Sequence, residues 1–342
     1  MVYTYASSYI SGFEKPIKTV LKERVKDVVI IKHFDGLVIY KTSLEFTKLQ
    51  LPCFNNTYQV LDMAESSHGL PYEVALKKFV KQSKLDFSGI LKNIAPLKGK
   101  SFKILPFDGN SPTGINFDLV SNLEEQIKRN LNLKIDFRRH DFDVILSRRS
   151  EGFFFVLFKL TYNRMGEKDL KKGELRPELC HILARISDIK PNDILIDPFC
   201  GHGSIPKEIV RNFNYNMLFA SDIDKDLINK LKLEFKKNKK NLFIKQRDAL
   251  NLEYFEDGFF DKITTDPPWN LYNAQVGDFS LFYKKMLKEF YRVLKSQGIC
   301  VILMGNIENF EQALDDNMFK LLEKYHTLVN GKKANVYKLI KV

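Results

Sequence analysis

From residue 176 onward, short apolar stretches alternate with amphipathic stretches of helical period. The apolar stretches include DILID at 193–197, NMLFAS at 216–221, DKITT at 261–265 and ICVILM at 299–304. Helical patterns separate them, for example PKEIVRNF at 206–213 and KDLINKLKLEF at 225–235. Parallel strands need a long crossover connection, which a helix usually supplies. The alternation therefore predicts an α/β domain over 176–342, with a mostly parallel sheet and helices on both faces.

The first 65 residues show a different pattern, typical of a small α+β unit. Val2 to Ile10 reads as a strand, and apolar residues at helical spacing follow Gly12. Two further apolar stretches, DVVIIKHF and LVIYK, flank Asp35-Gly36. An Asp-Gly pair between such stretches is a strong signal for a hairpin. We expect a separate domain over 1–65.

Residues 66–163 form a second α+β block. Helices are expected at YEVALKKFVKQ and around FDLVSNLEEQIKRNL, and strands at SFKILPF, IDF, DFDVILS and FFFVLFKL. The polar segment NRMGEKDLKKGEL follows, with little periodicity, which is typical of a linker between domains. We place this linker at 164–175.

The formal net charge of +12 favours a polyanionic partner, because neutralising phosphates releases counterions. Nucleic acid is the leading candidate, and a basic enzyme whose charge serves solubility is the alternative. The longest apolar run, Phe153 to Phe158, is far too short for a membrane span, and the first residues lack the pattern of a secretory signal. We therefore expect a cytoplasmic protein without membrane contact. The four cysteines are widely separated, so neither a disulfide framework nor structural zinc is expected.

The segment DILIDPFCGHGSIPKEI is the first with recognisable chemistry. An apolar strand ends at Asp197, a loop containing Gly201 and Gly203 follows, and then a helix. Ligands of open α/β sheets bind at the carboxyl ends of strands, where small residues allow close approach. Asp222 ends the next strand, where a carboxylate can bind ribose hydroxyls. A dinucleotide site would need G-x-G-x-x-G, but Pro206 stands in place of the last glycine, which argues against NAD.

Four carboxylates follow four successive apolar strands: Asp197, Asp222, Asp248 and Asp266. If the strands are parallel, all four lie at one edge of the sheet. Asp248 alone is weak evidence, since an aspartate after a strand is often a turn residue or a helix cap. In this series it could accept a hydrogen bond from an adenine amino group.

The segment FDKITTDPPWN, at 260–270, carries the most specific pattern. A strand followed by a turn would account for the two prolines. It would not account for the acid before them or for the chain's single tryptophan, Trp269, after them. A base with an exocyclic amino group needs acceptors for its N–H protons and a flat partner for its ring. Asp-Pro-Pro-Trp supplies both.

DPFCGHGS followed by DPPW resembles class I methyltransferases with a Rossmann-like fold that act on amino groups, particularly the RNA guanine-N2 methyltransferases. The resemblance covers 170–342 and includes LRPELCHILARI, the helix before the first motif. It implies S-adenosylmethionine (SAM) as cofactor. The implied cofactor-binding residues are Asp197, Pro198, Phe199, Cys200, Gly201, His202, Gly203, Asp222 and Asp248. The implied acceptor site is Asp266, Pro267, Pro268 and Trp269. His202, Ser204 and Asn270 depart from the residues common in the family, which leaves the substrate less defined than the cofactor.

The block at 66–163 resembles a THUMP domain in the order of its elements. Members of that domain family bind RNA, and residues 1–65 would be the ferredoxin-like domain that accompanies it. Candidates for phosphate contacts are Arg138, Arg139, Arg148 and Arg149, since arginine presents a planar donor fork. A solvated basic face is the alternative for each.

The resulting hypothesis is a SAM-dependent enzyme that methylates N2 of a guanosine in tRNA, with no metal and no obligate protein partner. The same chemistry on 23S rRNA, or methylation of adenine N6 in RNA or DNA, remains open. A catalytically silent RNA-binding protein is the alternative from a different class.

Overall fold

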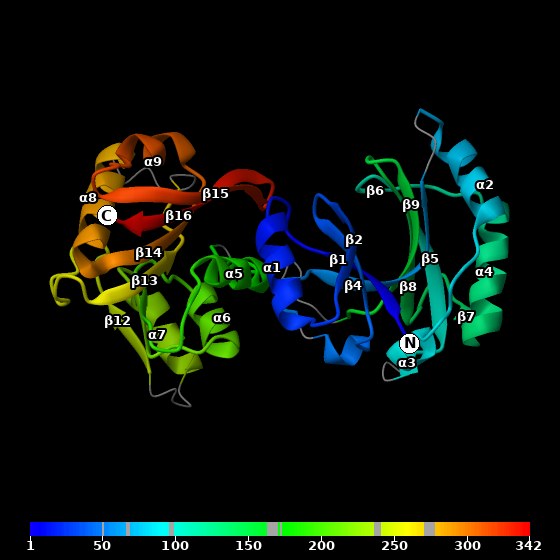
Figure 1. Cartoon of the computed structure of the whole chain (residues 1–342), viewed down its shortest axis with the longest axis horizontal. Coiled ribbons are helices and arrows are strands. Elements are labelled where there is room, and N and C mark those ends of the chain that lie inside the picture. The colour runs from blue at the N-terminus through cyan, green and yellow to red at the C-terminus, as the bar shows by residue number, and fades with distance from the viewer. Residues whose placement is uncertain are drawn as a thin grey trace. The chain divides into compact units, whose positions relative to one another are not determined.

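A computed structural model describes residues 1–49, 51–65, 69–95, 99–162, 170–171, 173–235, 241–269 and 278–342. The chain divides into two compact units (Figure 1). Unit 1 comprises Met1–Tyr9 and Lys18–Arg164, and unit 2 comprises Ile10–Ile17 and Met165–Val342. The predicted linker at 164–175 lies largely outside the described residues.

Unit 1 is built on a mainly antiparallel sheet. Within the described residues its strands follow the order β2-β3-β1-β4-β9-β8-β5-β6, and β7 pairs with β5. The strands are β1 (Tyr3–Ser8), β2 (Val29–Phe34), β3 (Leu37–Thr42), β4 (Asn56–Glu65), β5 (Ser101–Asp108), β6 (Ser111–Pro112), β7 (Lys134–Ile135), β8 (Phe142–Arg149) and β9 (Phe153–Lys159). The helices are α1 (Glu14–Arg24), which continues from unit 2, the 3-10 helix η1 (Phe46–Lys48), α2 (Tyr72–Gln82), α3 (Ile90–Ile94) and α4 (Phe117–Leu131).

Strand β9 explains why the run FFFVLF is continuously apolar. Phe153, Phe155 and Leu157 belong to a cluster on one face of the sheet. Phe154 lies on the other face and stacks on Phe79 of α2, with ring centroids 5.1 Å apart. A strand covered on both faces needs no polar alternation.

The sheet runs without interruption through the two predicted front domains. Strand β4 pairs with β9 from Tyr58↔Lys159 to Glu65↔Phe153. Strand β4 belongs to the region predicted as 1–65 and β9 to the region predicted as 66–163. The boundary at residue 65 is therefore not a break in the sheet.

Unit 2 contains the predicted alternation of strands and helices. Within the described residues its strand order is β12-β11-β10-β13-β14-β16-β15, parallel from β12 to β14 and antiparallel in the closing hairpin. The strands are β10 (Ile194–Asp197), β11 (Met217–Asp222), β12 (Leu242–Gln246), β13 (Phe260–Thr265), β14 (Leu294–Met304), β15 (Phe319–Val329) and β16 (Lys332–Lys341). The helices are α5 (Pro177–Ile186), α6 (Ser204–Asn212), α7 (Lys225–Glu234), α8 (Phe279–Val293) and α9 (Ile307–Ala313).

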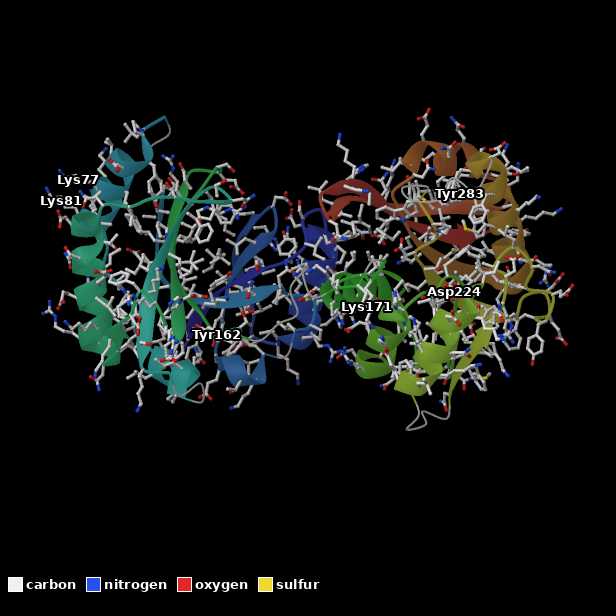
Figure 2. All side chains as sticks on the ribbon, turned by 180° about the vertical axis from the view of Figure 1, so that it is seen from behind. Lys77, Lys81, Tyr162, Lys171, Asp224 and Tyr283 are labelled. Atoms are coloured by element: carbon white, nitrogen blue, oxygen red, sulfur yellow. The ribbon has the colours of Figure 1, made fainter. Side chains whose placement is uncertain are left out.

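Helix α8 supplies much of the core of unit 2. Met286, Phe290 and Val293, which recur at helical spacing, are fully buried. Tyr283 is fully buried as well, whereas Phe282 beside it is only partly buried. Figure 2 shows Tyr283 on this helix.

One predicted strand is cut short. The segment IDF was expected to be extended, but β7 ends at Ile135. The side chain of Asp136 accepts hydrogen bonds from the backbone N–H groups of Arg138 and Arg139, at 2.8 and 2.9 Å. Aspartate favours such turns because its short side chain can bond to backbone just ahead of it. The chain therefore turns here.

Candidate functional site

The four carboxylates of the series lie at one edge of the sheet in unit 2. Strands β10 and β11 end at Asp197 and Asp222, Asp266 directly follows β13, and Asp248 lies just beyond β12. These four strands are neighbours and parallel, in the order β12-β11-β10-β13. The carboxyl ends of neighbouring parallel strands form the usual ligand-binding edge of an open α/β sheet.

Asp197 is buried inside this edge, only 1% exposed. Its Oδ1 accepts hydrogen bonds from the Thr265 hydroxyl at 2.7 Å and from the backbone N–H of Phe199 at 3.3 Å. Burial raises the pKa of Asp197 to about 8, and the charges of Asp222 and Asp266 act in the same direction. An unpaired buried carboxylate is costly, and such groups concentrate at functional sites.

The loop after β10 is held against β11. The backbone N–H of Gly201 donates to Oδ2 of Asp222 at 2.8 Å, and that of Cys200 donates to the Ser221 carbonyl at 2.9 Å. Gly203 has a φ of +79°, and a Cβ there would lie 2.3 Å from a methyl group of Leu231. At Gly201 a Cβ would meet no described atom within 4 Å. The loop therefore presents open space at Gly201, where a ligand can approach the backbone.

The other predicted loop residues differ in where their side chains lie. Pro198 and Cys200 are buried, and Phe199 packs against the rings of Phe282 and Phe290 on α8. These three residues support the loop from the core. His202 is half-buried.

Asp222 and Asp248 are more accessible. Oδ1 of Asp222 accepts the backbone N–H of Asp224 at 2.9 Å, and its side chain is half-buried. Asp248 is exposed, and its Oδ1 accepts the backbone N–H of Leu250 at 2.9 Å. Asp248 is thus a turn residue in this structure, the alternative considered for it, while its other oxygen makes no hydrogen bond within the described part of the chain.

Sequence reasoning missed two residues at this edge. Ile223 directly follows Asp222 and is 67% exposed, although it is strongly apolar. Arg247 lies with its guanidinium 4.5 Å from the ring centroid of Tyr254, which is 74% exposed. In the sequence, an apolar residue directly after Asp222, the last residue of the strand, was the signal that could have identified Ile223.

The Asp-Pro-Pro-Trp turn follows β13. The indole Nε1–H of Trp269 donates to Oδ1 of Asp266 at 2.8 Å. No described residue donates a hydrogen bond to Oδ2 of Asp266. Burial raises the pKa of Asp266 to about 7, and the bond from Trp269 acts in the opposite direction. Asn270 lies outside the described residues.

Two further residues fix this turn, and neither was identified from the sequence. The hydroxyl of Tyr283 donates to the carbonyl of Pro268 at 2.7 Å. Gly305, after β14, lies directly against Trp269, and a Cβ there would be 2.1 Å from the indole Cε3. Nothing in the sequence links helix α8 or Gly305 to the turn, since both interactions depend on tertiary packing.

These features fit a nucleoside-containing cofactor such as SAM. The loop has backbone open to a ligand at Gly201, a half-buried carboxylate at Asp222 and an exposed apolar side chain at Ile223. Pro206, which argued against NAD in the sequence, lies in the first turn of α6, where a missing N–H costs nothing.

Comparison with known proteins identifies the family. The sequence profile described as RMKL-like, methyltransferase domain matches residues 164–335. The chain belongs to this family. The class I methyltransferase fold expected from the sequence is confirmed, with SAM as the cofactor of this RMKL-like methyltransferase domain.

Individual relatives of this RMKL-like protein extend the match. A probable tRNA (guanine(10)-N2)-dimethyltransferase of Methanothermococcus thermolithotrophicus is 28% identical over 168 residues, 47% of this chain and 98% of the relative. A tRNA (guanine(6)-N2)-methyltransferase of Methanocaldococcus jannaschii is 21% identical over 293 residues, 71% of this chain and 76% of the relative. The crystal structure of TrmN from Thermus thermophilus has a TM-score of 0.76, with 18% identity and full coverage of both chains. That structural likeness shows the fold over the whole chain.

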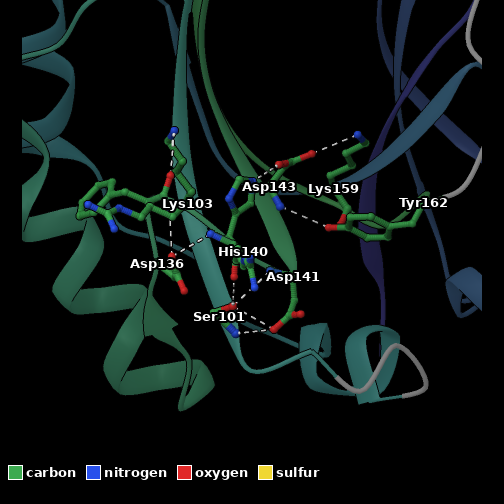
Figure 3. A network of polar contacts seen from close by, with 11 residues as sticks. Ser101, Lys103, Asp136, His140, Asp141, Asp143, Lys159 and Tyr162 are labelled. Carbon is green, nitrogen blue, oxygen red and sulfur yellow. Dashed lines mark hydrogen bonds and ion pairs between the residues drawn. The ribbon is translucent and has the colours of Figure 1, made fainter.

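The four predicted RNA-contacting arginines fall into two pairs in unit 1. Arg138 and Arg139 are exposed on the turn after β7, and Asp136, which accepts their backbone N–H groups, belongs to the polar network of Figure 3. Arg148 forms a bidentate ion pair with Asp108, at 2.7 and 2.6 Å. Arg149 bonds to Glu151 at 2.7 Å and to the Asp35 carbonyl at 2.8 Å. Phosphate contact by the second pair would require these bonds to open.

Other expectations concern cysteines, metals and membranes. All four cysteines are buried, and none of them forms a disulfide bond within the described part of the chain. In the part of the chain that the structure describes, no three His, Cys, Asp or Glu side chains gather as metal ligands would. Among the described helices, none has both the length and the apolar character needed to cross a membrane.

Proposed function

We propose that the protein transfers a methyl group from SAM to the exocyclic N2 amino group of a guanosine in tRNA. One observation carries this proposal. Asp266 has one carboxylate oxygen held by Trp269 and the other without a donor among the described residues, at the sheet edge that carries the cofactor loop. An amino group needs such an acceptor to be oriented for reaction.

The names of the relatives support guanine N2 in tRNA as the methyl acceptor. Both curated relatives described above are named for methylation of guanine N2 in tRNA. The net charge of +12 is suited to a polyanionic substrate. We place the reaction in the cytoplasm, with tRNA as the partner.

Each residue at the edge has a proposed part in binding. When bound, SAM supplies an electrophilic methyl group on a sulfonium centre. Asp222 would accept hydrogen bonds from the ribose hydroxyls, and Asp248 from the adenine amino group. The loop from Asp197 to Gly203 would hold the methionine end.

Asp266 has the central part in the reaction. The guanine must leave its stack for its amino group to reach a carboxylate at the edge of a sheet. Oδ2 of Asp266 and the carbonyl of Pro267 would then accept the two amino N–H bonds and direct the nitrogen lone pair at the methyl carbon. A new N–C bond forms as the C–S bond breaks, and the nitrogen loses one proton. A carboxylate with a pKa of about 7 can receive that proton.

Unit 1 would bind the rest of the tRNA. We propose a THUMP-like RNA-binding role for it, with Arg138 and Arg139 as the phosphate contacts. Both side chains are exposed, and the bonds from their backbone to Asp136 fix the turn that carries them. Arginines on a fixed turn lose less entropy on binding than arginines on a flexible segment.

The decisive experiment is incubation of the full chain with labelled SAM and, separately, total tRNA, rRNA or DNA. The nucleic acid is then digested and the modified nucleoside identified by mass spectrometry. N2-methylguanosine from tRNA alone supports the proposal. Labelled rRNA would mean that the substrate is rRNA and not tRNA, and N6-methyladenosine would mean that the acceptor is adenine and not guanine. RNA binding without methyl incorporation would mean that the protein is a catalytically silent RNA-binding protein.

A further inference from the structure

Trp269 makes a bond that other aromatic residues at its position would not make. Its indole N–H donates to Oδ1 of Asp266 at 2.8 Å. Phenylalanine has a ring of similar shape but no donor. The tryptophan therefore contributes a directed hydrogen bond as well as a flat surface.

The position of the indole is fixed by its surroundings. Gly305 lies so close to one part of the ring that any side chain there would collide with it. Trp269 also packs against the hydrophobic core around α8. Tyr283 fixes the preceding residue by donating to the Pro268 carbonyl at 2.7 Å. A donor held this firmly can fix the orientation of the carboxylate it bonds to.

In the described part of the chain, the titratable groups that interact with Asp266 include no cation that could take over this role. Asp197 on β10, Cys180 on α5 and Tyr283 on α8 interact electrostatically with Asp266, and none of them is positively charged. Desolvation raises the pKa of Asp266 and so disfavours its ionised form. Among the described residues, Trp269 makes the hydrogen bond that favours the ionised carboxylate.

We propose that Trp269 is a positioning residue whose indole N–H holds Oδ1 of Asp266, so that Oδ2 remains as the acceptor for the substrate amino group. This role rests on the proposed function and adds to it, because stacking alone would be served equally well by another aromatic ring. It also couples the reaction to pH: loss of the N–H removes a bond that favours the ionised form of Asp266.

The first test needs no substrate, because Trp269 is the only tryptophan in the chain. The full-length protein has a single indole signal, both in fluorescence and in a ¹H–¹⁵N spectrum. We expect this signal to change with pH with a midpoint near 7, as Asp266 gains a proton and the bond weakens. Asp266→Asn keeps an oxygen acceptor but cannot titrate, so the midpoint should disappear. A flat signal in the wild type, or the same midpoint in Asp266→Asn, would overturn the proposal.

The second test is the pH profile of single-turnover methylation by Trp269→Phe at saturating SAM. This variant keeps a ring for stacking and loses only the donor. We expect the acid limb of the profile to move to higher pH by on the order of one unit, so that the rate loss is large at pH 7 and small at pH 9. An unshifted profile would contradict the proposal.

Failure of the proposed function is distinguishable from failure of this inference. If the wild type forms no N2-methylguanosine, the function is wrong, but the indole titration still tests the bond between Trp269 and Asp266. If the wild type methylates guanosine but the indole signal does not follow the protonation of Asp266, the proposed function is supported and the positioning role of Trp269 is wrong.

Discussion

Units 1 and 2 are each built on a β-sheet, but the surroundings of their charged side chains differ. In unit 2, Asp197 is buried and Asp266 is half-buried, each with few hydrogen-bond donors, and desolvation raises the pKa of Asp197 to about 8 and that of Asp266 to about 7. In unit 1, the arginines of interest are either exposed or paired with acids. A carboxylate that is removed from water without a cationic partner lowers stability, so such a group indicates a functional site. Exposed arginines cost almost nothing, so they indicate a binding surface only weakly.

The difference predicts that substitutions in unit 2 affect the methylation rate or the binding of cofactor, whereas those in unit 1 affect affinity for tRNA. The largest effect is expected at Asp266. Asp266→Ala removes the acceptor that orients the amino group, so single-turnover methylation at saturating SAM should slow by at least about 100-fold. SAM affinity, measured by calorimetry, should remain close to that of the wild type, because the cofactor loop lies on other strands.

A wild-type methylation rate in Asp266→Ala would contradict the proposed mechanism, even if the variant still bound SAM. A parallel loss of SAM affinity would instead show that the two sites are not separable. Asp266→Asn is the matched control for folding, since it preserves the shape and the acceptor for the Trp269 N–H.

The next largest effect is expected at Asp222. Asp222→Ala removes an acceptor for the ribose and also the bond to Gly201 N–H that holds the loop. SAM binding should weaken by about 1 to 3 kcal/mol in calorimetry. Asp224 is a matched control two residues away (Figure 2): its side chain caps α7 by accepting from Asp226 and Leu227 N–H. Asp224→Ala should cost about 1 kcal/mol of stability and leave SAM affinity unchanged. Equal losses of SAM affinity in both variants would rule out a specific ribose contact.

The cost of burying a carboxylate in unit 2 is itself measurable. The pKa of Asp266 is raised to about 7 in the folded protein from an ordinary value of 3.8. The folded state therefore binds this proton more tightly than the unfolded state, and the free energy of unfolding falls as pH rises from about 4 to about 7. Asp266→Asn lacks this loss. Relative to the wild type, its free energy of unfolding should rise by about 4 kcal/mol across that window and then stay level. Urea unfolding at several pH values checks this, and a constant margin would contradict the raised pKa.

The sequence predicted more of unit 2 than of unit 1. Alternating strands and helices, the loop at Gly201 and the four carboxylates are local patterns, and parallel pairing brings them to one edge without further information. The bond from Trp269 to Asp266 depends on how the turn packs against Gly305, which no local pattern records.

In unit 1 the patterns predicted the strands and the main helices, but not how the sheet connects them. The pairing of β4 with β9 joins residues far apart in sequence, so two blocks that look separate share one sheet. The ion pair between Arg148 and Asp108 likewise spans two strands, and arginine composition alone could not separate it from the exposed Arg139. The THUMP-like assignment of this region remains a prediction.

The smallest effect is expected from the exposed arginines of unit 1. Replacing Arg138 and Arg139 together by alanine should weaken tRNA binding several-fold, because each arginine neutralises at most one phosphate. The slope of log Kd against log salt should fall by about one for each phosphate that is no longer neutralised. Arg148→Ala is the matched control: it breaks the ion pair to Asp108, so it should lower stability by about 1 kcal/mol while leaving the salt slope unchanged. If Arg148→Ala reduces the slope and the double variant does not, the ion pair opens to bind phosphate, and the paired arginines are the ones that bind RNA.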